Sequence, residues 1–167
     1  MQFSVGVEYA LHCLLYMVDM THGRAVRVKD LAEFQGVSET YLSKVYTKLR
    51  KSGLIKSIPG VNGGYELALP PEEITFWSVI EAIEGNSSMF QCAEIRRNIP
   101  LLDKNNLPDV YTKCPCTIKT VMVEAENQMR NYLDGKTLAW LHGQVKCKVT
   151  KEQEDATKEW FDRARST

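Results

Sequence analysis

At 167 residues the chain is long enough for one domain with an extension and too short for several large domains. Its 44% hydrophobic and 25% charged residues are ordinary for a soluble globular protein, and no apolar run approaches the roughly 20 residues that a membrane-spanning helix needs. Basic and acidic side chains both number 21, which excludes a uniformly basic nucleic-acid-binding protein, so any such surface must come from uneven charge distribution.

The first predicted element is a helix over residues 4–20 with apolar side chains along one face. Glu8 and His12 lie four residues apart and therefore share a neighbouring face of this helix. The N-terminus has neither a basic start nor a signal-peptide cleavage site, so we expect a cytoplasmic protein. In that compartment the five cysteines are reduced thiols, metal ligands or redox switches rather than structural disulfides.

A helix-turn-helix is predicted next, with its first helix over residues 28–34, a bend at Gly36 and a second helix capped by Ser38. The buried stripe of the second helix recurs at helical spacing and comprises Leu42, Val45, Tyr46 and Leu49. The opposite side then carries Thr40, Ser43, Lys44, Thr47, Lys48 and Lys51. Between residues 38 and 60 there are five cations and one anion, so a neutral chain has a local charge of +4 where a helix could enter a major groove.

A hairpin is predicted after this helix, from strands over residues 54–58 and 65–69 joined by a glycine-rich turn. The arrangement predicts a winged helix that binds duplex DNA, because outward Ser, Thr and Lys side chains suit phosphates and base edges alike. The alternative is a winged helix that binds protein or is purely structural. The candidate DNA-contacting residues are Lys29, Ser38, Thr40, Tyr41, Ser43, Lys44, Lys48, Asn62 and Gly63.

Beyond Pro70-Pro71, Thr75 is expected to cap a helix that ends at Gly85. No sustained hydrophobic period follows over residues 86–115, and so long a segment without a pattern is usually functional or disordered. An enzyme is not expected, because no nucleophile–base pair is evident in the sequence. The glycine-rich turn at residues 60–64 precedes a strand, whereas a phosphate-binding loop precedes a helix.

A long helix is predicted from Thr117 to Gly135, with apolar residues on its faces. Such a helix after a winged domain favours pairing of two subunits, whose two-fold symmetry would match palindromic half-sites in DNA. The alternative is a helix that folds back onto its own core. A short segment at residues 138–141 and an accessory tail helix, opened by Thr150 with Gln153, complete the chain.

Three of the five cysteines lie in or directly after the segment without a pattern: Cys92, Cys114 and Cys116. Three thiolates with one further ligand form a common set for iron–sulfur or zinc coordination. The Cys-x21-Cys-x-Cys spacing lacks the compact signature of a zinc ribbon or a ferredoxin. A bound cluster, a thiol redox switch, a zinc site and incidental cysteines therefore all stay open on spacing alone.

Several short motifs lie within residues 1–142: Glu8-Tyr9-Ala10-Leu11, Thr40-Tyr41-Leu42, Leu49-Arg50, Gly53-Leu54, Gly63-Gly64-Tyr65, Val79-Ile80-Glu81-Ala82-Ile83-Glu84-Gly85 and Thr137-Leu138. Together they resemble the Rrf-two superfamily of bacterial winged-helix transcriptional regulators, of the IscR, NsrR and CymR type. The resemblance implies a homodimer, paired through the helix from Thr117, that binds operator DNA with the helix from Ser38 and the wing. For the sensor branches it also implies an iron–sulfur cluster, 2Fe-2S or 4Fe-4S, in the segment before the dimerisation helix.

The resemblance also implies a set of metal ligands. The cysteine of the first cluster position corresponds to Cys92, and the two later cysteines match in kind but not in spacing. The fourth ligand, which varies in the family, would come from the first helix of the partner subunit, because no histidine lies between residues 116 and 142. The candidate metal ligands are Cys92, Cys114, Cys116, His12 and Glu8. Pro59 stands where cluster-type relatives often have a wing arginine, so their operator preference does not transfer.

The expected fold is mainly α, a winged helix-turn-helix DNA-binding domain with a small β-hairpin wing and a long dimerisation helix. Its expected divisions are a DNA-binding domain over 1–85, a cysteine-containing sensor loop over 86–116, a dimerisation helix and short helix over 117–143, and an accessory C-terminal helix over 144–167. The expected function is a dimeric transcriptional regulator, a repressor, that senses redox, nitric oxide or iron–sulfur status through a cysteine-ligated cluster. The alternative is a cluster-free thiol switch or a partner-controlled regulator of the CymR kind.

Overall fold

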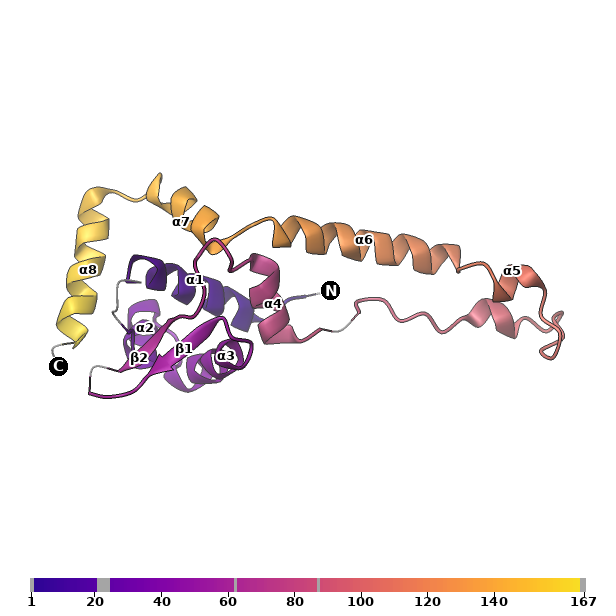
Figure 1. The fold of residues 1–167 in the computed structure, drawn as a ribbon, viewed down its shortest axis with the longest axis horizontal. Coiled ribbons are helices and arrows are strands. Elements are labelled where there is room, and N and C mark those ends of the chain that lie inside the picture. The colour runs from indigo at the N-terminus through magenta and orange to yellow at the C-terminus, as the bar shows by residue number, and fades with distance from the viewer. Residues whose placement is uncertain (1, 21–24, 62, 87, 166–167) are drawn as a thin grey trace. The chain divides into compact units, whose positions relative to one another are not determined.

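The structure is a computed structural model that describes residues 2–20, 25–61, 63–86 and 88–165 (Figure 1). These residues form two compact units. The core unit comprises residues 2–85 and those from 133 onward, and the cysteine unit comprises residues 86–132. Among the described residues, no helix has both the length and the apolar character to cross a bilayer.

Helices dominate both units, and a two-stranded antiparallel sheet completes the core unit. The elements of the core unit are α1 (Val5–Asp19), α2 (Val28–Gln35), α3 (Glu39–Lys51), β1 (Ile55–Ile58), β2 (Gly64–Leu67), α4 (Phe76–Glu84), α7 (Leu138–Lys146) and α8 (Lys151–Arg165). The elements of the cysteine unit are η1 (Ile95–Asn98), α5 (Asp109–Thr112) and most of α6 (Thr117–Asp134). The predicted helix-turn-helix, hairpin and long helix are thereby confirmed.

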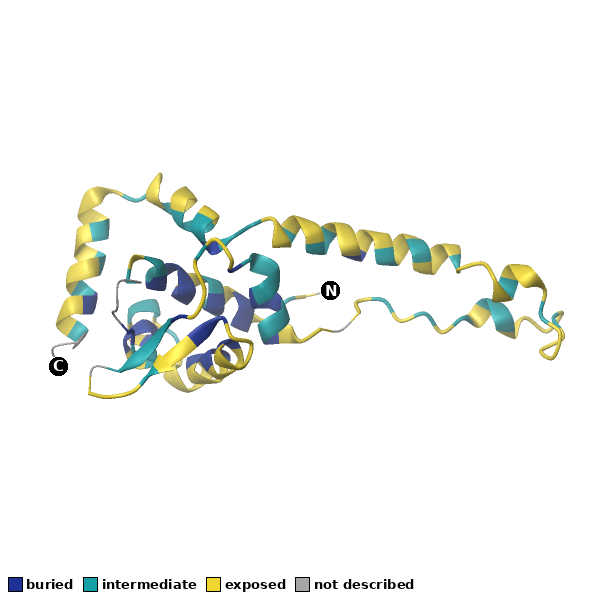
Figure 2. Ribbon diagram, viewed as in Figure 1, coloured by how far each residue is buried: buried dark blue, intermediate teal, exposed yellow. Residues whose placement is uncertain are grey.

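The hydrophobic core is built around α1, on which α3, α4, α7 and β2 pack. Ala10, Cys13 and Leu14 are fully buried in its middle, and Figure 2 shows the inner sides of α1 and α3 as buried. Cys13 is the small core residue that its place in an apolar stretch predicts. Burial raises the pKa of its thiol to about 12, so this cysteine is inert at neutral pH.

Helix α3 begins where Ser38 supplies a cap and ends just before Gly53, as predicted. The Ser38 hydroxyl accepts a hydrogen bond from the Tyr41 amide at 3.3 Å, and Gly53 has a φ of 78°. The predicted stripe is buried, and it comprises Leu42, Val45, Tyr46 and Leu49. The Tyr46 hydroxyl donates to the Met17 sulfur at 3.3 Å, which satisfies a polar group inside the α1–α3 contact.

The strand β2 is held to the segment before α2 as well as to β1. Val26 and Tyr65 exchange two backbone hydrogen bonds, of 2.9 and 2.8 Å, outside the β1–β2 pairing. A glycine is required next to them, because a Cβ on Gly64 would lie 2.5 Å from the Val26 carbonyl oxygen. The wing is therefore fixed to the helix-turn-helix by backbone contacts.

Capping residues also mark the starts of α4, α7 and α8 in the core unit. Thr75 forms a capping box with Ser78 at the start of α4, and Thr150 forms one with Gln153 at the start of α8. The predicted segment 138–141 is too short, because α7 runs on to Lys146. Its cap at Thr137 is followed by no residue that breaks a helix, and the exposed Gly143 is tolerated within it.

Substitution of Gly64 by alanine is expected to destabilise the core unit by about 1–3 kcal/mol, because the new methyl group overlaps the Val26 carbonyl. Gly143→Ala is the matched control, since nothing lies within 4 Å of its added Cβ. Alanine at this helical position should raise the free energy of unfolding by roughly 0.5–1 kcal/mol. Urea unfolding followed by circular dichroism measures both changes, and equal stability of the two variants would contradict the packing described.

Candidate nucleic-acid interface and cysteine site

The outer side of α3 is exposed (Figure 2), and its residues there are mostly polar, with cations along the length of the helix. Between residues 40 and 51 this helix has no acidic side chain. The tail does not cover it, because the exposed residues here are Thr40, Tyr41, Ser43, Lys44, Thr47, Lys48, Arg50 and Lys51. The buried stripe of α3 therefore leaves its polar side available to a partner.

The other candidate DNA-contacting residues are distributed around this surface. Lys29 is exposed on α2, and the Tyr41 ring packs edge-on against Tyr9 with their centroids 5.6 Å apart. At the wing, the Gly63 amide donates to the Gly60 carbonyl at 2.9 Å, which closes the tight turn. Asn62 lies outside the described residues.

Lys48 forms a hydrogen bond within the core unit that the sequence did not indicate. Its ammonium donates to the Ile83 carbonyl in the last turn of α4, at 2.7 Å. The next residue, Glu84, accepts from the Ser4 amide at 2.8 Å. Hydrogen bonds from Ser4 and the nearby charge of Lys48 lower the pKa of the Glu84 carboxyl. The Lys48 side chain thus links α3 to the end of α4, and its ammonium group already has one hydrogen-bond acceptor within the core unit.

In the cysteine unit, Arg96 is the residue that holds the segment together. Its guanidinium donates to the Glu94 carboxylate at 3.0 Å, to the Val110 carbonyl at 3.2 Å and to the Cys114 carbonyl at 2.7 Å. One side chain therefore connects three stretches of a segment that has few buried apolar contacts. Because no local pattern marks such a long-range contact, sequence reasoning missed it.

Cys92 and Cys116 are brought together by this arrangement. The Cys92 thiol lies 3.8 Å from a Glu94 carboxylate oxygen, and it lies near enough to the Cys116 side chain to help lower the pKa of that thiol. Glu94 has a φ of 50°, an uncommon conformation for a residue with a side chain that often marks a functional constraint. The backbone here turns sharply beside the paired thiols.

Cys116 stands immediately before α6, where free backbone amides favour a negative charge. Hydrogen bonds from the amides of Lys119 and Ile118 lower the pKa of its thiol, and the positive charge of Arg96 adds to the effect. Cys116 is therefore more readily ionised, and more nucleophilic, than an ordinary cysteine. The exposed Cys114 lies two residues away, on the other side of Pro115.

The start of the cysteine unit is fixed to α6 by a buried carboxylate. Glu126 accepts hydrogen bonds from the Met89 amide at 3.0 Å and from the Ser88 hydroxyl at 3.2 Å. The Arg130 guanidinium donates to the other carboxylate oxygen at 3.0 Å, and so compensates the charge. The segment that leads to Cys92 is thus held on the helix that follows Cys116.

The donor set fits an iron–sulfur cluster in chemistry, since three thiols belong to one unit, but only two of them meet. Across the described residues, no group of three or more His, Cys, Asp or Glu side chains is placed to hold a metal ion. The two other candidate ligands, Glu8 and His12, are exposed on α1 of the core unit and line a hollow of about 600 Å³. Their predicted role in a partner subunit stays a prediction.

Comparison with known proteins places the chain among bacterial regulators. Residues 3–144 match the family described as Rrf2, iron-dependent transcriptional regulator. The chain is 32% identical over 139 residues to the HTH-type transcriptional regulator NsrR of Geobacillus kaustophilus. The aligned region covers 83% of this chain and 88% of that protein. The resemblance that the sequence motifs suggest is thereby confirmed.

Two solved structures have the same fold. T. potens IscR superposes with a TM-score of 0.65 at 24% identity, over 90% of this chain and 93% of that one. The oxidised form of Staphylococcus aureus CymR superposes with a TM-score of 0.60 at 26% identity, over 85% of this chain and 96% of that one. The mainly α winged helix-turn-helix fold predicted from the sequence is confirmed.

In metal-free protein, Cys116 should react with iodoacetamide at lower pH than it does after unfolding in urea, because folding lowers the pKa of its thiol. Arg96→Gln removes the nearby cation and should shift the midpoint of the pH–rate profile back toward the unfolded one. Mass spectrometry of the modified Cys116 peptide provides the rates. Identical midpoints in folded and unfolded protein would contradict a lowered pKa of the Cys116 thiol in the folded state.

Proposed function

Because the chain belongs to the Rrf2 family of transcriptional regulators, we propose that it binds duplex DNA as a homodimer and that the state of Cys92, Cys114 and Cys116 controls its affinity. The observation that supports DNA binding is the exposed, cationic side of α3 in a chain whose net charge is zero. A helix is about 10–12 Å wide with its side chains, and the major groove of B-DNA is about 12 Å wide.

The contacts proposed for DNA divide by side-chain chemistry. Lys44, Arg50 and Lys51 provide charges for phosphates, which position the protein on the duplex. Thr40 and Ser43 provide hydroxyl groups that can reach base edges in the major groove. The wing turn would lie beside the backbone of the adjacent groove.

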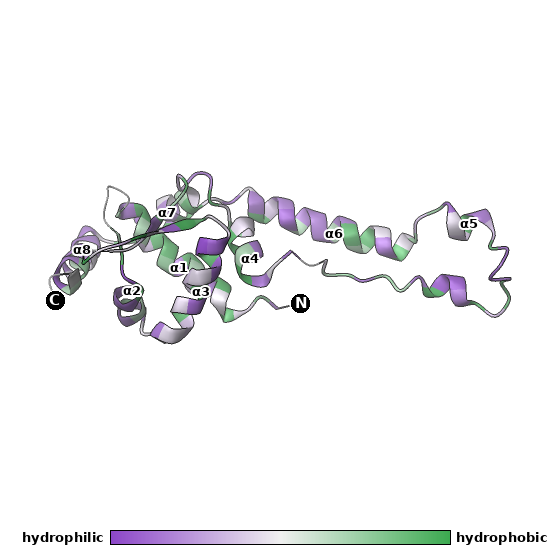
Figure 3. Ribbon diagram, turned by 60° about the horizontal axis from the view of Figure 1, so that its bottom comes forward, coloured by the Kyte–Doolittle hydropathy of each residue, from purple (hydrophilic) through white to green (hydrophobic). Residues whose placement is uncertain are grey.

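The proposed dimer forms through α6. Its apolar residues gather in the N-terminal half of the helix (Figure 3), and Ile118, Val121 and Met122 are 68%, 57% and 43% exposed. An apolar face of this kind is stable when a second copy covers it. Two copies paired in this way present two α3 helices, which suits DNA with two half-sites.

The first proposed form of control is an iron–sulfur cluster held by Cys92, Cys114 and Cys116, with His12 or Glu8 of the partner subunit as fourth ligand. The family's description as iron-dependent supports it, and so do three thiols within one unit. When bound, such a group supplies a centre that responds to oxidants and nitric oxide. The chain's own part is to fix the thiols: Arg96 holds the Cys114 carbonyl, and the amides at the start of α6 favour the Cys116 thiolate.

A second candidate is a thiol switch without metal, which the proximity of the Cys92 and Cys116 side chains favours. A peroxide would oxidise these two thiols to a disulfide, and the peroxide oxygens would leave as water or as water and an alcohol. The bond would covalently join the start of the cysteine unit to the start of α6. Cys114 has no part in this chemistry.

Lys44→Ala should weaken binding to a short mixed-sequence duplex and reduce the slope of log affinity against log salt by about one per bound subunit, because a phosphate contact is lost. Lys148→Ala is the control, since this exposed lysine follows α7, away from the proposed interface. Fluorescence anisotropy across a salt series measures both slopes. Equal slopes for the two variants would exclude α3 as the phosphate-binding helix.

Anaerobic purification with an iron count and a visible spectrum separates the two forms of control. If the cluster forms, Cys92→Ser and Cys114→Ser should both lower the iron content. If the thiol switch operates, iron is absent, Cys92→Ser abolishes the response of DNA binding to peroxide, and Cys114→Ser leaves it intact. An iron-free protein whose DNA binding ignores peroxide would contradict both.

A further inference from the structure

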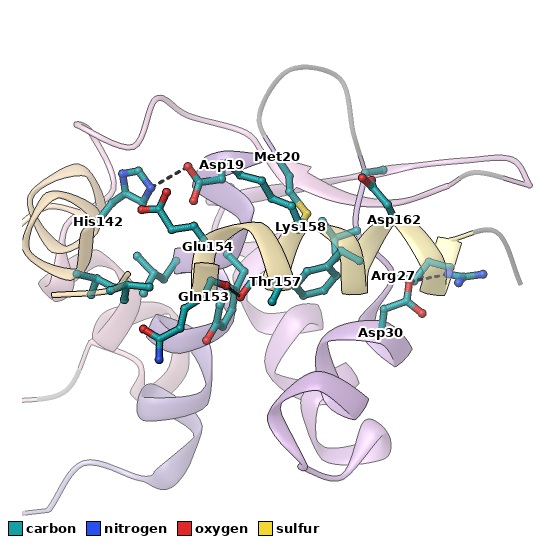
Figure 4. A pocket seen from close by; sticks show the side chains of 18 of the residues that line it. Asp19, Met20, Arg27, Asp30, His142, Gln153, Glu154, Thr157, Lys158 and Asp162 are labelled. Carbon is teal, nitrogen blue, oxygen red and sulfur yellow. Dashed lines mark hydrogen bonds and ion pairs between the residues drawn. The ribbon is translucent and has the colours of Figure 1, made fainter. Parts of the chain in front are cut away.

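The C-terminal helix α8 encloses a cavity of about 720 Å³ with α1, α7 and the segment before α2, all within the core unit (Figure 4). This volume lies within the range of roughly 300–1,000 Å³ that small-molecule sites occupy. Residues 151–165 of α8 lie beyond the 3–144 segment that matches the family. The cavity therefore depends on a part of the chain to which the family match assigns no role.

The walls of the cavity are largely apolar and well anchored. Their apolar side chains include Leu15, Tyr16, Val26, Val145, Val149 and Phe161. Helix α8 is held by an aromatic cluster in which the Phe34 ring centroid lies 4.9 Å from those of both Trp160 and Phe161. The Arg27 guanidinium also donates to the Ala164 carbonyl. Helix α8, which forms one wall of the cavity, is thus packed on the helix-turn-helix rather than loosely attached.

Most charges around the cavity are compensated by one another. At one end Asp19 accepts from His142 at 2.9 Å and pairs with Lys146 at 3.5 Å. At the other end Arg27 pairs with Asp30 at 2.8 Å. These pairs balance the charges of the residues that they include.

Three further charged residues line the cavity from α8: the exposed Lys158 and Asp162 and, nearest the start of the helix, Glu154. The Glu154 side chain is half-buried on α8 and extends toward the end of the cavity where Asp19 and His142 meet (Figure 4). Among the ion pairs formed by the described residues, none includes Glu154. Lys158 lines the cavity one turn further along α8, but it is exposed and no ion pair joins it to Glu154 among the described residues. A half-buried carboxylate without a close ion-pair partner beside apolar walls is electrostatically unfavourable, and a bound cation would relieve that cost.

We propose that this cavity binds an apolar organic cation of small-molecule size, with Glu154 as its counter-charge. The apolar walls accommodate the body of such a molecule, and the Tyr16 and Phe161 rings offer faces that attract a positive charge. A bound molecule contacts α1 and α8 together, and α8 packs on Phe34 of α2. Binding therefore stiffens the attachment of α8 to the helix-turn-helix, independently of the cysteine unit.

The test uses the full chain and two probe ions of the same shape and opposite charge, tetraphenylphosphonium and tetraphenylborate, in isothermal titration calorimetry. The phosphonium ion should bind at least about ten times more tightly than the borate. Glu154→Gln should weaken phosphonium binding about tenfold, which corresponds to about 1.4 kcal/mol. Glu152→Gln is the matched control, because this exposed carboxylate lies in the same first turn of α8 and does not line the cavity. It should leave the affinity unchanged.

A second variant places the binding in the cavity itself. Thr157 lines it from α8, so Thr157→Phe should fill the space and abolish phosphonium binding while the helical content stays that of the wild type. Equal affinity for the two ions, or loss of affinity with Glu152→Gln equal to that with Glu154→Gln, would overturn the proposal. So would phosphonium binding that a folded Thr157→Phe variant retains.

Discussion

The structure depends on the burial of one side of α3 against α1. Full burial of a side chain such as Leu or Val contributes roughly 1.5–3 kcal/mol, so the stripe from Leu42 to Leu49 fixes the rotation of the helix within narrow limits. Once Leu42, Val45 and Leu49 face inward, the polar residues between them must face outward. The burial of the apolar residues of α3 therefore places its cations on the surface.

One cation of α3, Lys48, also links this helix to α4. Lys48 extends from α3 to the Ile83 carbonyl in the last turn of α4, and α4 directly precedes the cysteine unit in sequence. A conformational change at the end of α4 would therefore act on α3 through this hydrogen bond. In the cysteine unit, Arg96 and Glu126 hold a segment that lacks an apolar core of its own. Charged hydrogen bonds, which respond to chemical change more readily than packed apolar side chains, thus hold the part of the chain that carries the thiols.

Local signals predicted the fold well. The caps at Ser38, Thr75 and Thr150 and the apolar period of α3 each depend on residues within one or two turns, so the sequence alone placed these helices. The helix α7 extends beyond the predicted end at Leu141 to Lys146. The site was predicted less completely. The contacts of Arg96 and Lys48 join residues far apart in sequence, and the approach of Cys92 to Cys116 is likewise not marked by their spacing.

The central claim is that the outer side of α3 binds nucleic acid, and lysine acetylation read by mass spectrometry tests it directly. With saturating duplex DNA, Lys44 and Lys51 should be acetylated several times more slowly than in the free protein, because phosphates cover their ammonium groups. Lys148, which is exposed after α7, should be acetylated at the same rate in both states. Unchanged acetylation of Lys44 and Lys51 in a protein that is demonstrably bound to DNA would contradict the account.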